Sequence, residues 1–477
     1  MNSAFASRLA QAAAFAGAIA LPAVTPDQAA KIDAIGRRSV AGAAAPGVTI
    51  AVAQGTRIVY LKGFGKSNVE DDVAAGGATR YPIGSNTKQF TSAAILMLQD
   101  RGLLNINDRL SKYLPEIPHA NEVTIRELLT HAGGYAEYTE REDFDEVGNR
   151  PATLAQIVGT VDSRPLSFKP GTKREYSNTG YALLTMVIER VSKTTYAQFM
   201  QRNIFTPLGM SSTYVRTYAD TFPNVATEYD SFAFGPWEHA LSLDYSWFAG
   251  AGSIISNAQD LVKWNAGLPT LLSKHSLTEM LTPIDLGSGY PGYAFGIAVN
   301  KLPNGHRMIA HGGNTTGAAT QDARFPDDNL SIIVLANSGT FSYDAAVSAV
   351  YGVLVPSVNA AKPAAHQKAA GDAADSALAT EGERWLDRAV AGQVDMSQLR
   401  PDFRARMTQQ HRIDFSELAA LGPREYTPIM TDRRPPNSTI GYMVKTPKKS
   451  FVYYFARDDS GQVSGAILVD IVDYTKL

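Results

Sequence analysis

The chain of 477 residues contains no cysteine. Disulfide bridges, thiolate zinc sites and a cysteine nucleophile are therefore excluded. The absence does not identify a compartment, because cysteine-free proteins are stable on either side of a membrane. An excess of one charge is lacking as well: 44 Lys and Arg stand against 46 Asp and Glu, so no broad basic field predicts a nucleic-acid partner.

Long apolar runs are also scarce. Beyond the N-terminus, none reaches the roughly 20 residues that a membrane-spanning helix needs, so no span is expected in the mature chain. Residues 1–25 hold one arginine, a run of small apolar residues and the pattern Ala18-Ile19-Ala20. This is typical of a secretory signal peptide and predicts a periplasmic or secreted protein. The alternative is an Ala-rich amphipathic helix of the mature protein, which leaves a cytoplasmic location open.

The order of patterns predicts a main domain over 26–358. Two β-type runs, 47–54 and 57–64, are joined by a hairpin signal at Gly55-Thr56. Further β-type runs follow much later, at 293–300, 307–313, 318–325 and 330–337. A mostly helical region, about 85–285, lies between the two groups. We expect one antiparallel sheet made from both groups, with helices from 26–41 and 341–354 on one face.

The remaining chain predicts a second, smaller unit. An Ala-rich linker is expected over 359–379, followed by an α+β domain over 380–477. In that domain the stretch 381–390 indicates a helix. Three runs indicate strands: 438–446, 450–458 and 463–472.

The stretch 81–98 predicts a helix that begins with a hydroxyl and an amine on the same side. Its apolar positions have helical spacing: Phe90, Ala93, Ala94, Met97 and Leu98. Ser85 and Lys88, three positions apart, are neighbours on its first turn. A serine hydroxyl needs a base to act as a nucleophile, and a lysine whose pKa is lowered by burial can be that base. Alone, the pair is explained adequately by an N-capping serine and a solvated lysine.

Tyr176 and Asn178 lie at the end of a Pro-Gly loop, directly before an amphipathic helix. A tyrosine hydroxyl can pass protons when cationic neighbours lower its pKa, and an asparagine amide can donate to a substrate carbonyl. The alternatives are a half-buried core ring for Tyr176 and an N-cap for Asn178.

The segment 309–319 joins two β-type runs and contains His311, Gly312 and Gly313. The two glycines allow a substrate backbone to approach the strand edge closely. The next residue, Asn314, could offer its backbone N–H to an oxyanion. The alternative is a capping or core histidine, with the glycines forming a turn.

In this order and at these separations, Ser85-x-x-Lys88, Tyr176-x-Asn178 and His311-Gly312-Gly313 resemble the three motifs of the serine β-lactamase and penicillin-binding-protein superfamily. The Tyr-x-Asn variant is similar to the class C β-lactamase-like branch, which includes D-alanyl-D-alanine carboxypeptidases, D-aminopeptidases and carboxylesterases. Other stretches resemble the same branch, among them "LLTHAGG" (128–134) and "RFPDDNLSIIVLANS" (324–338). The resemblance covers about 26–355. It implies an α/β fold of the α+β type: an antiparallel sheet flanked by helices, with an inserted helical subdomain.

The resemblance implies that Ser85 is the acylated nucleophile and that Lys88 takes its proton or tunes the site. Tyr176 then protonates the leaving group and activates the deacylating water. Asn178 orients the acyl amide of the substrate, and the backbone N–H groups of Ser85 and Asn314 form the oxyanion hole. Whether Lys88 or Tyr176 is the main base stays open. No cofactor and no metal is expected.

The third motif departs from the Lys-Thr-Gly of the β-lactamases, because His311 stands in the lysine position and, with Gly312 and Gly313, would bind substrate. A histidine is mostly neutral at pH 7, so the attraction for a substrate carboxylate is weaker. Arg324 is a candidate for the missing cation by chain proximity only. His-Gly-Gly is more similar to esterase and aminopeptidase members, which predicts weak or absent β-lactam turnover.

The sequence predicts a serine hydrolase that cleaves an ester, amide or peptide bond of a small molecule through an acyl-enzyme. A β-lactamase or DD-carboxypeptidase is the alternative within the superfamily. A catalytically silent binding module is the alternative of another class, although every motif position is filled. The C-terminal domain could gate the site, shield the sheet or form a homo-oligomer. Trp237, Tyr245 and Trp247 could line a substrate pocket or pack a lid.

Overall fold

The computed structural model describes most of the chain between residues 24 and 474. The gaps within this range are 42–43, 141–143, 161–163, 217–221, 232–235, 287–291, 357–372, 402, 405–414, 433–436 and 473. The predicted signal peptide, 1–25, therefore lies almost wholly outside the described residues. The same holds for most of the predicted linker, 359–379.

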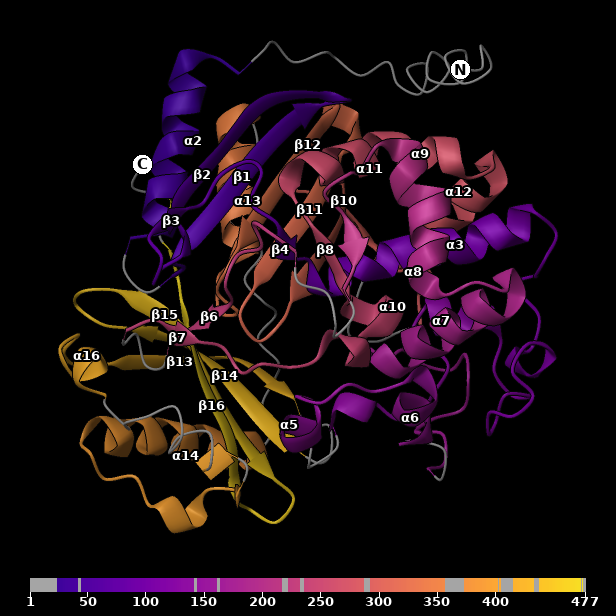
Figure 1. Ribbon diagram of the computed structural model, residues 1–477. Helices are drawn as coiled ribbons and strands as arrows, with labels where there is room; N and C mark the ends of the chain where they lie inside the picture. The colour runs from indigo at the N-terminus through magenta and orange to yellow at the C-terminus, as the bar shows by residue number, and fades with distance from the viewer. Residues whose placement is uncertain are drawn as a thin grey trace.

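One seven-stranded sheet unites segments from both ends of the predicted main domain, in the order β3-β2-β1-β12-β11-β10-β9. All of its strand pairs are antiparallel. The fold class expected from the sequence is therefore confirmed (Figure 1). The strands are β1 (Gly47–Gln54), β2 (Arg57–Asn68), β3 (Val73–Ala74), β9 (Ala298–Lys301), β10 (Arg307–Asn314), β11 (Ala319–Phe325) and β12 (Leu330–Ala336).

Two helices cover one face of this sheet, α2 (Pro26–Ser39) and α13 (Tyr343–Leu354), and they share an apolar core with β1 and β12. A capping box at Thr25 and Gln28 begins α2. The opposite face packs on α3 (Thr87–Asp100) and α11 (Ala258–Leu271), within the largest apolar core of the described chain. Helix α3 is buried on almost all sides, so the polar side chains of its first turn lie inside the protein.

The helical region inserted between the two strand groups adds several shorter elements beside α3 (Figure 1). Its longest helix is α7 (Asn178–Ser192), which packs against both α3 and α10 (Ala249–Gly252). The other α-helices are α4 (Ile125–Leu129), α5 (Phe144–Val147), α6 (Leu154–Gly159), α8 (Tyr196–Met200), α9 (Thr206–Leu208) and α12 (Lys274–Met280). The short strands are β4 (Tyr81–Pro82), β5 (Tyr214–Val215), β6 (Tyr229–Asp230), β7 (Glu238–His239) and β8 (Ile254–Ser256).

The strand expected over 293–300 begins only at Ala298. Gly296 has φ +67°, and a Cβ placed there would lie 2.6 Å from the carbonyl oxygen of Lys88. The chain therefore bends at Gly296 and packs closely on α3. Tyr293 and Phe295 are buried as a result. This bend brings Tyr293 close to the residues of the candidate site.

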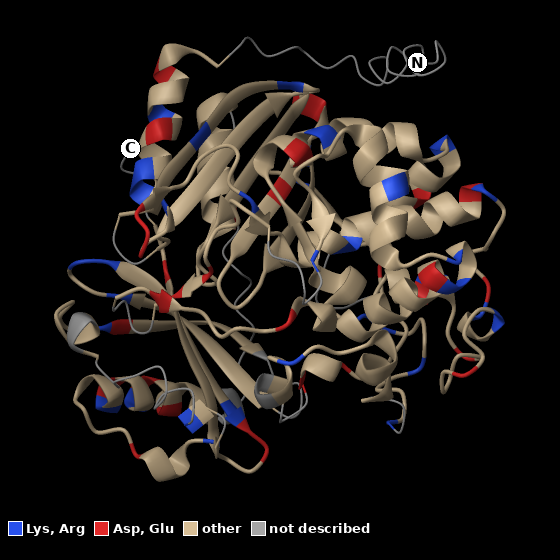
Figure 2. Cartoon of the chain, viewed as in Figure 1, with Lys and Arg blue, Asp and Glu red and all other residues tan. Residues whose placement is uncertain are grey.

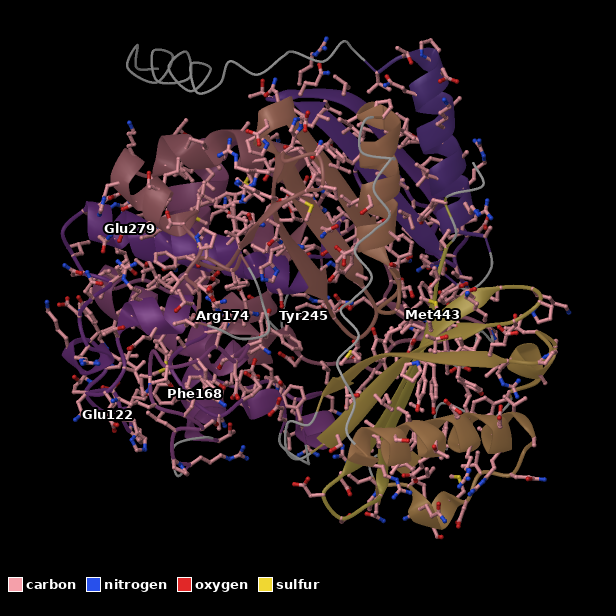
Figure 3. The ribbon with its side chains drawn as sticks, turned by 180° about the vertical axis from the view of Figure 1, so that it is seen from behind. Glu122, Phe168, Arg174, Tyr245, Glu279 and Met443 are labelled. Atoms are coloured by element: carbon pink, nitrogen blue, oxygen red, sulfur yellow. The ribbon has the colours of Figure 1, made fainter. Side chains whose placement is uncertain are left out.

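The C-terminal unit, residues 373–470, forms a four-stranded antiparallel sheet with α14 (Ala373–Val390) packed on one face. Its strands are β13 (Glu425–Asp432), β14 (Asn437–Lys445), β15 (Ser450–Asp458) and β16 (Val463–Asp470), and a short helix α16 (Ser416–Ala419) precedes them. Its apolar core contains only residues of this unit. Met443, labelled in Figure 3, lies on this sheet.

The prediction of three strands in this unit was wrong, because β13 is a fourth. Pro428 lies inside β13 and cannot donate to a strand ladder, which weakens the strand signal of this segment. The structure accommodates Pro428 because β13 is the edge strand, with a register irregularity between Pro428 and Met430.

The end of the chain returns to the large sheet. Val472 and Tyr474 belong to the apolar core under α2, and Tyr474 Oη lies 2.7 Å from Ser39 Oγ on that helix. Acidic and basic residues are mixed along α2 and α14 in Figure 2, in line with the even balance of charge. None of the helices in the described ranges combines the length and apolar character needed to cross a membrane.

Candidate active site

Ser85 lies on a single 3₁₀ turn, Gly84–Asn86, that leads directly into α3. Gly84 has φ +49°, and a Cβ there would lie 2.9 Å from the backbone nitrogen of Asn314. Only glycine combines this conformation with such a close approach. The turn therefore presses the backbone before Ser85 against the end of β10, where the sequence placed the second oxyanion donor.

Lys88 is fully buried on the first turn of α3. Its Nζ lies 3.1 Å from Ser85 Oγ, 2.8 Å from Asn178 Oδ1 and 2.9 Å from the carbonyl oxygen of Ala251. Burial lowers the pKa of Lys88 to about 7, against a smaller opposing effect of the Glu137 carboxylate. A large fraction of this amine is therefore uncharged near neutral pH and can accept a proton.

Tyr176 donates its hydroxyl to Ser85 Oγ at 2.6 Å. The Lys88 amine lies 4.6 Å from the centre of the Tyr176 ring. The Ser85 hydroxyl is thus held between an amine and a phenol, which gives the site two groups that can exchange a proton with the same oxygen. The sequence left the choice between these two bases open, and both are in position.

Asn178 is the first residue of α7, and the cap of this helix is the neighbouring Ser177, whose side chain accepts from Gly180 N–H. The Asn178 side chain is therefore released from capping. Its oxygen accepts from Lys88, and its Nδ2 donates to Glu137 at 3.2 Å. This arrangement fixes the orientation of the amide and leaves Nδ2 a second hydrogen for another acceptor.

Glu137 was not singled out from the sequence. Its carboxylate accepts from the backbone N–H of Asn178 at 2.5 Å and of Thr179 at 3.3 Å, so it lies at the positive end of α7. Its negative charge also acts on Lys88, where it raises the pKa of the amine and so opposes the effect of burial. The pattern alone could not reveal this role, because Glu137 and Lys88 are brought together only by the packing of α3 and α7.

His311, Gly312 and Gly313 lie on β10, which pairs with β11 on one side. A Cβ at Gly313 would lie 1.9 Å from the carbonyl oxygen of Ile83, so the glycine permits the contact between this strand and the Ser85 turn. The His311 and Tyr176 rings are 6.5 Å apart. All three motifs therefore meet around Ser85.

Two of the sequence-based suggestions concern residues that have other partners in the structure. Arg324 donates to Gln89 Oε1 at 3.2 Å, in a buried polar cluster that includes Asp322 and Trp264. It is thus committed there rather than to a substrate carboxylate. Trp247 is buried and donates to the Arg150 carbonyl at 2.8 Å, and Tyr245 is buried too, which favours packing over pocket lining for both.

Two further residues escaped the sequence interpretation, His131 and Tyr293. The Tyr293 hydroxyl lies 2.8 Å from His131 Nε2 and 3.2 Å from His311 Nε2. His131 belongs to the "LLTHAGG" stretch that supported the family resemblance, so a signal existed for it. Tyr293 carried none, because it fell in a segment interpreted as a strand.

The Beta-lactamase family model matches residues 32–355, which is most of the chain. The chain belongs to the Beta-lactamase family. This Beta-lactamase family member is 28% identical over 309 residues to "Penicillin-binding protein 4*" of Bacillus subtilis, a match that covers 61% of this chain and 67% of the relative. It is 29% identical over 328 residues to "Protein flp" of Staphylococcus aureus, with 66% of this chain and 64% of the relative covered.

Solved structures show the same fold. A D-stereospecific amidohydrolase from Streptomyces sp. has a TM-score of 0.60 at 27% identity, covering 68% of this chain and 98% of its own. An octameric penicillin-binding protein homologue from Pyrococcus abyssi has a TM-score of 0.63 at 20% identity. That match covers 93% of this chain and 96% of the homologue, so it extends into the C-terminal unit.

Proposed function

We propose that this protein is a serine hydrolase that transfers the acyl group of an ester or amide to Ser85 and then to water. The observation that carries the proposal is the position of Ser85 Oγ, 3.1 Å from the buried Lys88 amine and 2.6 Å from the Tyr176 hydroxyl. A hydroxyl flanked by an amine of lowered pKa and a phenol is an activated nucleophile.

In the first half of the reaction, neutral Lys88 takes the Ser85 proton as Oγ attacks the carbonyl carbon. The oxyanion that forms faces the backbone N–H groups of Ser85 and Asn314. As the bond to the leaving group breaks, Tyr176 gives its proton to the departing oxygen or nitrogen and regains one from Lys88. Water then enters and the same groups act in reverse, which releases the acid and restores the Ser85 hydroxyl.

The substrate class that fits best has an uncharged leaving group. Burial, with a smaller effect of the Lys88 charge, lowers the pKa of His311 to about 4, so the third motif offers no cation at neutral pH. Arg324 is held by Gln89. Amides of D-amino acids are a specific candidate because similar structures include a D-stereospecific amidohydrolase and a D-amino acid amidase. A β-lactamase or DD-carboxypeptidase is less favoured, since its substrates carry a carboxylate.

A silent binding module is the competing proposal from another class. It would not need the lysine amine and the tyrosine hydroxyl to converge on one serine oxygen. One experiment separates the two. The protein is incubated with a fluorophosphonate and with a labelled penicillin, and the modified peptide is mapped. Label on Ser85, and its loss in Ser85→Ala, is expected.

The same preparations are then assayed with p-nitrophenyl esters, D-amino-acid amides and nitrocefin. Ser85→Ala should remove turnover and stay folded, because the apolar contacts of α3 lie at other positions. Label on a different residue, or no label and no turnover with folded protein, would refute the proposal. Nitrocefin turnover that matches the best ester would refute the preference for uncharged leaving groups.

A further inference from the structure

The turn that joins β10 to β11 is held by a glutamate outside the three motifs, Glu228. This residue directly precedes β6, and its carboxylate accepts from the Thr315 hydroxyl at 2.5 Å. A carboxylate acceptor makes this a strong hydrogen bond. Thr315 Oγ1 itself accepts from the backbone N–H of Ala318 at 2.9 Å. The Thr315 hydroxyl therefore connects the two arms of the turn to the segment around β6.

The rest of the turn packs on the same segment. The Thr316 hydroxyl donates to the carbonyl oxygen of Leu241, just after β7, at 2.8 Å. A Cβ at Gly317 would lie 2.5 Å from the Cβ of Glu228 and 2.6 Å from that of Ala240, so the glycine permits this close contact. The residues that flank β6 and β7 thus form the surface on which the turn rests.

The register of β10 determines where the Asn314 N–H points. The Thr315 N–H donates to the Ala318 carbonyl oxygen at 2.9 Å, so Thr315 faces β11. Successive residues of an antiparallel ladder alternate between its two sides, so the Asn314 N–H points away from β11. On that side β9 pairs with β10 as far as Ala310, and Gly84 lies beside Asn314. The Asn314 N–H therefore faces the turn that carries the candidate nucleophile.

We propose that Glu228 is a positioning residue of the oxyanion hole. It holds Thr315, and through the backbone of the turn it keeps the N–H of the preceding Asn314 directed at the carbonyl oxygen of the substrate. The proposal rests on the proposed function, because the oxyanion hole belongs to the same site. It goes further in naming a residue that acts through Thr315 rather than on the substrate.

The negative charge of Glu228 is balanced within the same cluster. A carboxylate near an oxyanion would oppose the developing charge. Arg216 Nη1 lies 3.9 Å from Glu228 Oε1, so the charges of the two side chains offset each other. The guanidinium carbon of Arg216 also lies 4.5 Å from the centre of the Tyr245 ring. Glu228 can therefore hold the turn without adding a net charge beside the oxyanion.

Tyr245, labelled in Figure 3, is the third member of this cluster. Its hydroxyl donates to Glu228 Oε1 at 2.8 Å and also contacts the Thr315 side chain. Burial, and then the charge of Glu228, raise the pKa of Tyr245 well above its ordinary value. The phenol therefore stays a donor at neutral pH and fixes the orientation of the carboxylate.

The contribution of Glu228 should be partial, because this end of β10 has another attachment. Asn314 Nδ2 donates to the Gly339 carbonyl oxygen at 3.0 Å, and this bond remains when Glu228 is removed. Loss of a whole oxyanion donor costs about 10²- to 10³-fold in rate. A donor that is still present but less well directed should cost less, on the order of 10-fold.

Three substitutions of threonine separate this role from general stability. Thr315→Val removes the hydroxyl and keeps the branched shape, whereas Thr315→Ser retains the hydroxyl. Thr213→Val is the matched control, because Thr213 is a buried threonine beside β5 that donates to Asp260 at 2.9 Å. The same chemical change there removes a similar hydrogen bond, and it should affect stability alone.

The first measurement compares phenyl acetate with O-phenyl thionoacetate, in which sulfur replaces the carbonyl oxygen. A sulfur anion is larger and accepts hydrogen bonds less well, so a well-directed oxyanion hole prefers the oxygen ester. Thr315→Val should lower the kcat/KM ratio of the oxygen ester over the thiono ester by about 3- to 10-fold. Thr315→Ser and Thr213→Val should each change this ratio less than about 2-fold.

Glu228→Leu tests whether Glu228 acts through Thr315. It removes both acceptor oxygens and keeps an apolar stem beside Gly317. This variant should lower the same ratio by a similar factor. In the double variant Glu228→Leu/Thr315→Val the ratio should be no lower than in the more affected single variant, because residues that act as one unit are not additive.

The second measurement needs no turnover. Hydrogen exchange of the full-length protein, followed by mass spectrometry on peptides that cover 312–320, reports how firmly the turn is held. The N–H groups of Thr315 and Ala318 close the turn, so this peptide should exchange at least about 5-fold faster in Glu228→Leu than in the wild type. In Thr213→Val it should exchange as in the wild type.

The proposal is overturned if Thr315→Val lowers kcat/KM for both esters equally, which is the result expected of a merely structural role. It is also overturned if the double variant is additive, or if the turn exchanges no faster in Glu228→Leu. If the wild type hydrolyses neither ester, the proposed function fails, while the exchange measurement still decides whether Glu228 holds the turn.

Discussion

At the scale of single residues, the pH dependence of the reaction is expected to follow Lys88. Its pKa is lowered to about 7, and only its neutral form can take the proton of Ser85. The kcat/KM for an uncharged ester should therefore rise as pH increases through about 7 and level off above it. Below about pH 7 it should fall by about tenfold per pH unit.

The pH profile is best measured with an uncharged p-nitrophenyl ester in buffers of constant ionic strength. His131 and His311 should not contribute to the transition near pH 7, because burial lowers the pKa of both rings: that of His311 to about 4, and that of His131 well below its ordinary value. A profile that stays flat between about pH 5.5 and 8 would show that Lys88 is not the base of the rate-determining step.

The burial of Lys88 should also have a cost in stability. The pKa of Lys88 falls from 10.5 to about 7 on folding, so the unfolded chain binds the proton more tightly. Between these pH values the free energy of unfolding should decrease as pH falls, by up to about 1.4 kcal/mol per pH unit from this residue. Below about pH 7 this contribution should become constant.

The test is the difference in free energy of unfolding between the wild type and Lys88→Met, measured by urea denaturation from about pH 7 to 10. The difference isolates Lys88, since other groups titrate in both proteins. It should move in favour of the wild type as pH rises. No change with pH would contradict a lowered pKa for this lysine.

The residue scale also shows the limits of sequence interpretation. Ser85, Lys88, Tyr176 and Asn178 were named from motifs, and the structure brings them into one hydrogen-bonded group. Tyr293 could not be found in this way. Its importance comes from contacts with His131 and His311, which are far away along the chain and meet it only through the bend at Gly296.

At the scale of elements, the N-terminus of α7 is expected to tune Lys88 through Glu137. The carboxylate accepts backbone hydrogens at this helix end and favours the charged form of Lys88. Glu137→Gln removes the negative charge, so the pKa of Lys88 should decrease. The midpoint of the pH profile should move by about 0.5 to 1 unit toward acid.

Glu122→Gln is a matched control. Glu122 is an exposed glutamate that pairs with His119, and the same substitution there should leave the midpoint unchanged. The midpoint is obtained from kcat/KM profiles of the three proteins. A shift toward alkaline pH in Glu137→Gln, or an equal shift in both variants, would contradict the role of Glu137.

Elements with regular patterns were predicted well. The hairpin of β1 and β2, the strands β10, β11 and β12, and the helices α2 and α13 lie close to the expected ranges. The errors have identifiable causes. The apolar run that contains Gly296 bends at this glycine and packs on α3 instead of continuing as a strand. Pro428 weakens the strand signal of β13, although a proline can be accommodated in an edge strand, which is paired on one side only.

At the scale of the whole molecule, the return of the chain end to α2 should contribute to the stability of the large sheet. Tyr474 reaches Ser39 Oγ and packs in the core under this helix. Tyr474→Ala should lower the free energy of unfolding by about 1 to 3 kcal/mol, because a packed ring and a hydrogen bond are lost. Activity on esters should stay close to that of the wild type.

Thermal and urea denaturation measure this effect, and Lys448→Ala, an exposed position in the C-terminal unit, serves as the control. A loss of stability in Tyr474→Ala no larger than that of the control would mean that the contact between Tyr474 and Ser39 does not hold the chain end in place.

The path of the chain around the C-terminal unit has a mechanical consequence. Leu354 and Val355, which precede the C-terminal unit, and Val472 and Tyr474, which follow it, all pack in the core under α2. The C-terminal unit is therefore attached to this core through the residues on both of its sides. The second of these attachments includes the contact of the Tyr474 hydroxyl with Ser39 Oγ. A force that pulls α2 and the chain end apart would act on the contact between Tyr474 and Ser39 before it reached the sheet of the C-terminal unit.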